Sequence, residues 1–452
     1  MRTLPEHNNR VTTKSTNNLA ELMQAVLERA RKQGATDAMV SVNHDSGFSV
    51  DVRMGEVETV AFSEDKGVSL VIYFGHQKGI ASSTDTSEKA LDELVSAACD
   101  IARVSAADPC FGLPDRELIN NQFPDLSLYH PWDIAPPEAI EKALACEAKA
   151  LSIDKRITNS DGVNCSTYAF CNGFANTHGG HGIIHSTRHG VSCAVVAKEG
   201  ETMQRDYDYT TARNANHLKA LELVAEKTVE KTVGRLGAKK IKTQKAPVLF
   251  SSLVSSSLLS SFINAINGGN LYRKNSFLLD SMGQQIFPAG FKIYEQPFLL
   301  GALGSSPFDG EGVPTRNNVF IEDGILQQYV LSSYSARRLG LKTTANSGGV
   351  HNLTLDATAG GLDELLQKMD TGLLVTELMG QGVNGLTGDY SRGAFGFWVE
   401  KGQIQHPVEE ITIAGNLKAM FKDIIAVGND INPNISTRCG SLLIAEMMIA
   451  GH

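Results

Sequence analysis

Residues 39–74 read MVSVNHDSGFSVDVRMGEVETVAFSEDKGVSLVIYF and carry the clearest strand pattern in the chain. Apolar residues alternate with polar ones in short runs, which is the period of half-buried β-strands. Turn-forming residues separate these runs at Asp45-Ser46-Gly47, Met54-Gly55 and Asp65-Lys66-Gly67. The stretch therefore predicts an antiparallel meander.

A helix is expected on each side of this meander. Leu19, Leu22, Met23 and Val26 recur at helical spacing, and Gly34 follows as a C-cap. A second amphipathic pattern runs through residues 86–104. Helix, strands and helix together predict an α+β unit over residues 1–108.

A proline-rich segment, residues 109–137, follows and is expected to be a linker or an ordered extended crossing. Residues 138–240 again read as helix, strands and helix, with helices over 138–153 and 218–236. This pattern hints at a structural repeat, although the two units share no sequence identity.

The C-terminal unit, residues 241–452, is the largest and the richest in glycine. A buried strand is predicted at Pro247-Val248-Leu249-Phe250, and a helix over 253–266 that Gly268-Gly269 stops. Glycine-rich, mainly antiparallel strands follow. The whole chain is thus expected to be α+β, with two helix–strand–helix units before a β-rich C-terminal domain.

Composition excludes several classes of protein. The net charge of −9 and the absence of any basic run longer than Lys239–Lys242 argue against a nucleic-acid partner. Seven cysteines without a CxxC pair indicate reduced thiols. No apolar signal sequence and no stretch of about 20 apolar residues occurs. We therefore expect a cytoplasmic protein with no membrane segment.

Two motifs are typical of cofactor or metal sites. Residues 380–385 fit GxGxxG, but turn and strand residues follow where a dinucleotide site needs a helix, so a tight loop is the preferred prediction. His178, His181, His185 and His189 could bind a metal, yet residues i and i+4 of a strand are about 13 Å apart. A polar strand face is the alternative prediction.

The chain has no complete hydrolytic motif. Neither HExxH nor HExxxH occurs, and no serine or cysteine lies in a GxSxG elbow. Polar residues set among glycines lie in 306–313, 348–352, 387–393 and 427–430. Such segments suit a peptide-binding cleft, and they equally suit tight β-turns.

Several motifs occur in order along the chain: Gly55-Glu56-Val57-Glu58, Ser186-Thr187-Arg188-His189, Tyr272-Arg273-Lys274, Ser306-Pro307-Phe308-Asp309, Glu377-Leu378-Met379-Gly380-Gln381-Gly382-Val383, Thr387-Gly388-Asp389 and Cys439-Gly440. With these motifs the chain resembles the PmbA/TldE proteins, of the family shared with the TldD peptidases, over nearly its whole length. The motif at 377–383 looks specific to the PmbA/TldE branch.

The resemblance implies where a metal site would lie and why it is lost. TldD-like proteins carry HExxxH on the helix after the first strand of the C-terminal domain, and a cysteine near the C-terminus. Here Ser260, Ser261 and Ala265 stand at the positions of the first His, the Glu and the second His, while Cys439 matches the cysteine. One thiolate alone should not hold zinc tightly. The expectation is no metal and no catalytic residue in this chain, and zinc in a TldD-like partner.

The resemblance also implies the function. It points to a non-catalytic subunit of a TldD–TldE heterodimer that degrades unfolded peptides, including microcin B17 and antitoxin processing, with a homodimer possible when the chain is alone. The loops 380–383 and 388–393 are candidates for substrate or partner contact. The residues assigned to that contact are His351, Asn352, Gln381, Gly382, Asp389 and Arg392, with loop stabilisation as the alternative role. Competing hypotheses are a self-sufficient metallopeptidase using the histidine cluster or Cys439, and a regulator that binds DNA gyrase.

Overall fold

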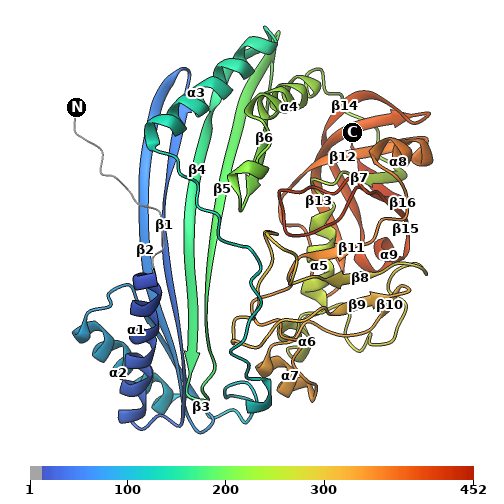
Figure 1. The fold of residues 1–452 in the computed structure, drawn as a ribbon. Helices are drawn as coiled ribbons and strands as arrows, with labels where there is room; N and C mark the ends of the chain where they lie inside the picture. The colour runs from blue at the N-terminus through green and yellow to red at the C-terminus, as the bar shows by residue number, and fades with distance from the viewer. Residues whose placement is uncertain (1–12, 452) are drawn as a thin grey trace. The chain divides into compact units, whose positions relative to one another are not determined.

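The computed structural model describes residues 13–451, with side chains from residue 18 onward, and shows two compact units (Figure 1). The first comprises residues 13–197, Arg205–Lys231 and Leu300–Thr315; the second comprises Lys198–Gln204, Thr232–Leu299 and 316–451. The protein has an α+β fold, as predicted. Among residues 13–451, no helix has the length and apolar character needed to cross a membrane.

One six-stranded antiparallel sheet organises the first unit, in the order β3-β2-β1-β4-β5-β6. Its strands are β1 Asp37–Arg53, β2 Glu56–Phe74, β3 Gln77–Ser83, β4 Ile157–Asn176, β5 His181–Glu199 and β6 Thr202–Ala212. The two predicted helix–strand–helix segments thus contribute three strands each to a common sheet, joined where β1 pairs with β4. The pattern of either segment alone gave no sign of this pairing.

Helices cover one face of this sheet at its two ends (Figure 1). They are α1 Thr13–Lys32, α2 Glu88–Val104 and α3 Pro136–Ile153; α4 Leu221–Gly234 and the short 3₁₀ turns η1 Arg116–Leu118 and η2 Ala215–His217 follow. Val40 and Val42 of β1 are buried with residues of α1 and α2. The alternating Ser41, Asn43 and Asp45 are only half-buried on the other face. Burial therefore follows the two-residue period of the strand.

Two of the three predicted turns in the meander are wrong. Gly47 and Gly67 lie inside β1 and β2, where Asp45 pairs with Asp65. A Cβ at Gly47 would overlap the backbone of β4, and one at Gly67 would overlap the Asn43 side chain. These glycines are present because neighbouring groups approach closely, not because the chain reverses. Only the turn at Met54-Gly55, where both residues have positive φ, is confirmed.

The proline-rich segment is an ordered crossing over β5. The carbonyl oxygen of Leu128 accepts a hydrogen bond from the Thr187 amide at 2.9 Å, and the His130 amide donates to the Thr187 hydroxyl at 2.9 Å. Leu126 and Leu128 of this segment are buried. The segment closes over the middle of the sheet, between the helices at the two ends.

The second unit contains a larger sheet in the order β14-β13-β12-β7-β16-β15. Its strands are β7 Gln244–Phe250, β12 Gly372–Met379, β13 Asp389–Glu400, β14 Gln403–Asn416, β15 Ile424–Val427 and β16 Leu442–Ala450. Only β7 and β12 pair in parallel among the ladders of this sheet in the described chain. A further pairing between β14 and β16 joins β14, β13, β12, β7 and β16 into a closed ring.

A smaller sheet and five helices complete this unit. The small sheet has the order β10-β9-β8-β11. Its strands are β8 Ile293–Glu295, β9 Val319–Glu322, β10 Ile325–Leu326 and β11 Leu353–Leu355, and the helices are α5 Ser256–Ala265, α6 Gly268–Tyr272, α7 Ser333–Leu339, α8 Leu362–Met369 and α9 Leu417–Lys422. A core that includes Phe250, Phe262 and Phe421 joins the strands to α5 and α9.

The prediction that Gly268-Gly269 ends helical structure is wrong in part. Helix α5 ends at Ala265, but α6 begins at Gly268 because the Asn267 side chain accepts a hydrogen bond from the Gly269 amide at 2.9 Å. A Cβ at Gly268 would overlap Ser335 and Leu331. The first glycine therefore permits close packing at a helix start.

Glu147 on α3 provides a test of how the β1–β2 turn is held. Its carboxylate is 1% exposed and accepts hydrogen bonds from the amides of Met54 and Gly55 at 2.9 and 2.8 Å. Glu147→Ala leaves both amides without this acceptor, so we expect a loss of about 1–3 kcal/mol in the free energy of unfolding. Urea denaturation followed by circular dichroism measures it, with Glu141→Ala, at an exposed position of the same helix, as the control. Equal midpoints for the two variants would contradict this assignment.

Candidate functional site

A pocket of about 510 Å³ lies within the second unit, over one side of α5. Its walls come from α5, from the segment after α6, from the loop between β12 and β13, and from Arg392 of β13. The lining residues are Ser256, Ser257, Ser260, Ser261, Asn264, Ala265, Asn275, Phe277, Gln381, Val383, Gly385 and Arg392. Five positions singled out in the sequence, Ser260, Ser261, Ala265, Gln381 and Arg392, therefore meet in one pocket.

Helix α5 is amphipathic, and its polar side faces the pocket. Leu258, Leu259 and Phe262 are buried in the core, while the serines at i, i+1, i+4 and i+5 line the pocket. The hydroxyls of Ser260 and Ser261 donate to the carbonyl oxygens of Ser256 and Ser257, each at 3.0 Å. These serines satisfy their own donors within the helix.

The GxGxxG segment is a loop between β12 and β13, as predicted. The Ser391 amide donates to the Gly382 carbonyl oxygen at 2.7 Å, and the Phe277 amide donates to that of Gly385 at 3.0 Å. A Cβ at Gly382 would overlap the carbonyl oxygen of Ser391, whereas one at Gly385 would meet nothing within 4 Å. Gly382 is thus needed for close backbone approach and makes no side-chain contribution to the pocket.

Arg392 brings positive charge to the pocket. Its Nε is buried and has no hydrogen-bond partner, and no ion pair joins it to an acidic side chain in the described part of the chain. Tyr390, on the same face of β13, has a buried hydroxyl. Burial raises the pKa of Tyr390 to about 12, and the charge of the Arg392 guanidinium and a hydrogen bond with it oppose that rise.

Cys439 is fully buried and does not line the pocket. Burial raises the pKa of its thiol to about 12, an effect that the neighbouring Ser255 opposes. Its Sγ donates to the Gly440 carbonyl oxygen at 3.2 Å. A thiol in this setting stays protonated at neutral pH, so it is a poor metal ligand and a poor nucleophile.

The residues at the positions of a TldD-like metal site do not fit zinc. Ser260, Ser261 and Ala265 offer no imidazole, carboxylate or thiolate, and Cys439 is buried away from the pocket lining. Within residues 18–451, no group of three or more His, Cys, Asp and Glu side chains is placed to hold a metal ion. The donor chemistry of this pocket is therefore that of hydroxyls, amides and one guanidinium.

The histidine cluster is divided among separate contacts. His178 lies 2.9 Å from an oxygen of Asp37, whereas His181 is exposed. His185 packs edge-on against Tyr129, and His189 contacts the Thr167 hydroxyl through Nδ1 and the His130 carbonyl oxygen through Nε2. Burial lowers the pKa of both His185 and His189. His185 and His189 therefore anchor the crossing segment on β5, whereas the side chains of His178 and His181 lie apart from these contacts.

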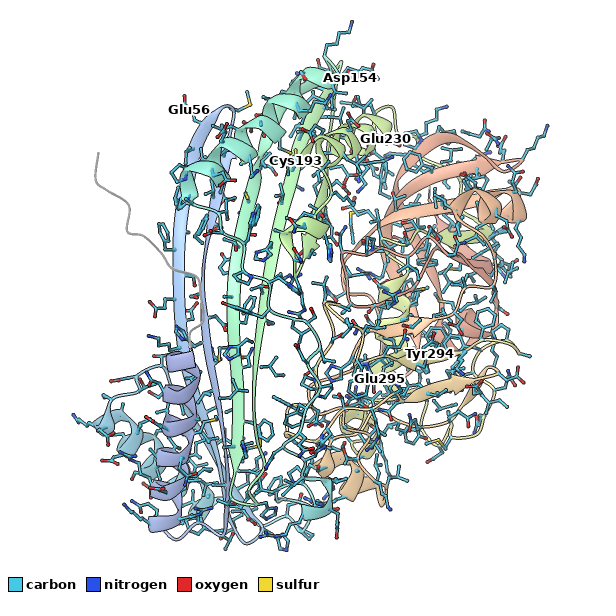
Figure 2. The ribbon with its side chains drawn as sticks, in the orientation of Figure 1. Glu56, Asp154, Cys193, Glu230, Tyr294 and Glu295 are labelled. Atoms are coloured by element: carbon cyan, nitrogen blue, oxygen red, sulfur yellow. The ribbon has the colours of Figure 1, made fainter. Side chains whose placement is uncertain are left out.

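His351 contacts a buried carboxylate, and neither His351 nor Asn352 lines the pocket. Glu295, beside Tyr294 in Figure 2, accepts hydrogen bonds from the amide of His351 at 2.7 Å and from the Asn346 and Asn318 side chains. Burial raises the pKa of Glu295 in spite of these donors. Asn352, with a φ of 45°, donates to the carbonyl oxygen of Gln296. These contacts favour loop stabilisation for His351 and Asn352.

Asp389 likewise holds a loop. It accepts hydrogen bonds from the Thr387 hydroxyl at 2.6 Å and from the Asn416 side chain at 3.1 Å, and these bonds hold its pKa below the usual range. Sequence reasoning did not single out Asn264, Asn275 and Phe277, although they line the pocket. A run of serines at residues 251–261 was the one available signal for this surface.

Family models of the PmbA/TldA metallopeptidases match the chain in three parts: domain 1 over residues 38–102, the central domain over 129–236 and the C-terminal domain over 243–451. The chain belongs to the PmbA/TldD family. Metalloprotease PmbA of Escherichia coli O157:H7 is 48% identical, with 96% of each chain covered, and the PmbA homolog of Haemophilus influenzae is 45% identical over the same shares.

Solved structures of the family share the fold. A proposed modulator of DNA gyrase from Bacteroides thetaiotaomicron matches with a TM-score of 0.91 and 29% identity, over 98% of this chain and all of that one. TldE from Thermococcus kodakarensis matches with a TM-score of 0.83 and 20% identity, over 95% of this chain and all of that one. The second likeness concerns the fold alone.

The close approach of the Gly382 backbone to β13 can be tested with a matched pair of substitutions. Gly382→Ala forces the loop away from β13, so we expect a loss of about 1–3 kcal/mol in unfolding free energy. Gly385→Ala meets open space and should leave stability within about 0.5 kcal/mol of wild type. Denaturant titration of both variants measures the difference. Similar stabilities for the two would show that the close approach at Gly382 is absent.

The buried state of Cys439 predicts its reactivity. With a pKa of about 12, roughly one thiol in ten thousand is ionised at pH 8. Iodoacetamide should therefore label the half-exposed Cys110 in the native protein long before Cys439, as quantified by mass spectrometry of peptides. In urea the two should react alike. Rapid labelling of Cys439 in the native protein would mean that the reagent reaches this buried thiol.

Proposed function

We propose that this chain is the non-catalytic subunit of a TldD–TldE-like zinc metalloprotease that acts on unfolded peptides. The zinc and the HExxxH motif would belong to a TldD-like partner in a cytoplasmic heterodimer. The observation that carries the proposal is the polar side of α5, where Ser260, Ser261 and Ala265 line the pocket without a metal ligand. Similarity to relatives called metalloprotease PmbA supports this proposal.

The pocket supports a role in handling peptides. Hydroxyl and amide groups with a guanidinium suit a peptide backbone better than they suit hydrolysis, because no group there can activate water. The proposal includes natural substrates of the microcin B17 and antitoxin type. It also includes a homodimer that the chain forms without its partner. The related protein described as a gyrase modulator motivates a separate test of gyrase binding.

Metal analysis and reconstitution test the proposal together. The purified, tag-free chain should hold near-zero zinc by elemental mass spectrometry and should not cleave fluorescein-labelled unfolded casein. Adding a TldD-like protein should produce cleavage, and a partner with its HExxxH glutamate changed to Gln should not. A chelator should abolish the activity.

Other outcomes would end the proposal. A mixture that stays inactive on several unfolded peptides argues against a peptidase subunit. About one zinc per chain with cleavage by the chain alone would favour a self-sufficient metallopeptidase, for which His181→Ala and His185→Ala become the first variants. Retention of gyrase subunits on the immobilised chain in salt would favour the regulator.

A further inference from the structure

Arg392 is the only charged side chain among the residues that line the pocket. Two acidic residues near it in sequence have other partners. Asp389 accepts hydrogen bonds from Thr387 and Asn416. Glu377 forms an ion pair with Arg235 at 2.7 Å. Asp389 also lies on the opposite face of β13, three residues from Arg392. The positive charge in the pocket therefore has no counter-charge among the lining residues.

The guanidinium of Arg392 is half-buried at the wall of the pocket, and no acidic side chain pairs with it in the described part of the chain. Its Nε is shielded from water, and the Tyr390 hydroxyl is a neighbour of the guanidinium. Taking a charged group out of water without a counter-charge is costly. An anionic group bound in the pocket would supply the missing counter-charge, and a guanidinium binds carboxylates in a paired geometry.

The other side of the pocket has the opposite hydrogen-bonding character. The hydroxyls of Ser260 and Ser261 donate hydrogen bonds to α5 carbonyl oxygens, so the lone pairs of their Oγ atoms remain to accept bonds. A fully ionised phosphate group has only acceptor oxygens and would match these serines less well than a ligand with N–H donors. A peptide residue has both an anionic carboxylate and an N–H donor.

We propose that this pocket binds a peptide carboxylate, with Arg392 receiving the carboxylate and Ser260 and Ser261 accepting peptide N–H groups. Phe277 and Val383 supply apolar surface for the side chain of the bound residue. The walls are preformed, since hydrogen bonds from Ser391 and Phe277 fix the loop at Gly382 and Gly385. Less conformational entropy is then lost on binding.

This inference rests on the proposed handling of unfolded peptides, and its test uses the chain alone. Three labelled, unstructured peptides of one sequence are compared by fluorescence anisotropy: one with a free C-terminus, one with a C-terminal amide, and one amidated with a single Asp added. We expect binding of a carboxylate-bearing peptide and at least tenfold weaker binding of the amide without Asp. Which acid peptide binds distinguishes a terminal carboxylate from a side-chain carboxylate.

Substitutions connect the binding to the pocket. Arg392→Gln should weaken binding at least tenfold, while Arg392→Lys should retain part of it. Arg338→Gln, at an exposed arginine on α7 that does not line the pocket, is the matched control and should bind like wild type. Ser260→Glu keeps the guanidinium but adds a negative charge at an exposed helical position, and it should also abolish binding.

Specific results would overturn the inference. Equal binding of the acid and amide peptides, or binding that survives both Arg392→Gln and Ser260→Glu in folded protein, would place the contact elsewhere. No binding of any peptide would also overturn it. Cleavage restored by a TldD-like partner in that case would leave the proposed function standing, so the two failures are distinguishable.

Discussion

The parallel pairing of β7 with β12 is the constraint on which the candidate site depends. Leu373, Leu374 and Val375 lie opposite Val248, Leu249 and Phe250, so both strands end at the same edge of the sheet. The chain leaves β7 into α5 and leaves β12 into the loop at 380–388. Crevices form where the carboxyl ends of parallel strands meet. The pocket is such a crevice, made by segments more than a hundred residues apart.

The antiparallel partner of β7 explains why Cys439 lies near this site but outside the pocket. Leu442, at the start of β16, pairs with Phe250 at the end of β7. The residues before β16 therefore lie beside the start of α5, and the Ser252 amide donates to the Ser441 hydroxyl at 3.1 Å. The same register buries Cys439 beside Ser255, and burial raises the pKa of its thiol although Ser255 opposes that rise.

Local sequence predicted the elements better than their pairing. The strand at 247–250 and the helix after it follow from apolar pattern and length, and the structure contains both as β7 and α5. The meander was predicted, but Gly47 and Gly67 read as turns because a single sequence does not reveal a neighbour that demands a missing side chain. Pairing of β7 with β12 or of β1 with β4 depends on distant residues that local periodicity cannot identify. The sequence therefore predicted only some of the pocket residues, through motifs that lie on separate walls of the pocket.

A comparison of partly buried arginines separates structural roles from a binding role. Arg213 donates to the carbonyl oxygens of Ala302 and Leu303 at 3.0 and 2.8 Å, although burial lowers its pKa to about 10. Arg235 pairs with Glu377 and stacks on Phe395. Each of these arginines has acceptors within its own unit, and these contacts offset the free-energy cost of removing the guanidinium from water. Arg392 is half-buried with the Tyr390 hydroxyl as a neighbour, but no carboxylate pairs with it in the described part of the chain. A half-buried charge without a counter-charge is expected where a ligand supplies that charge.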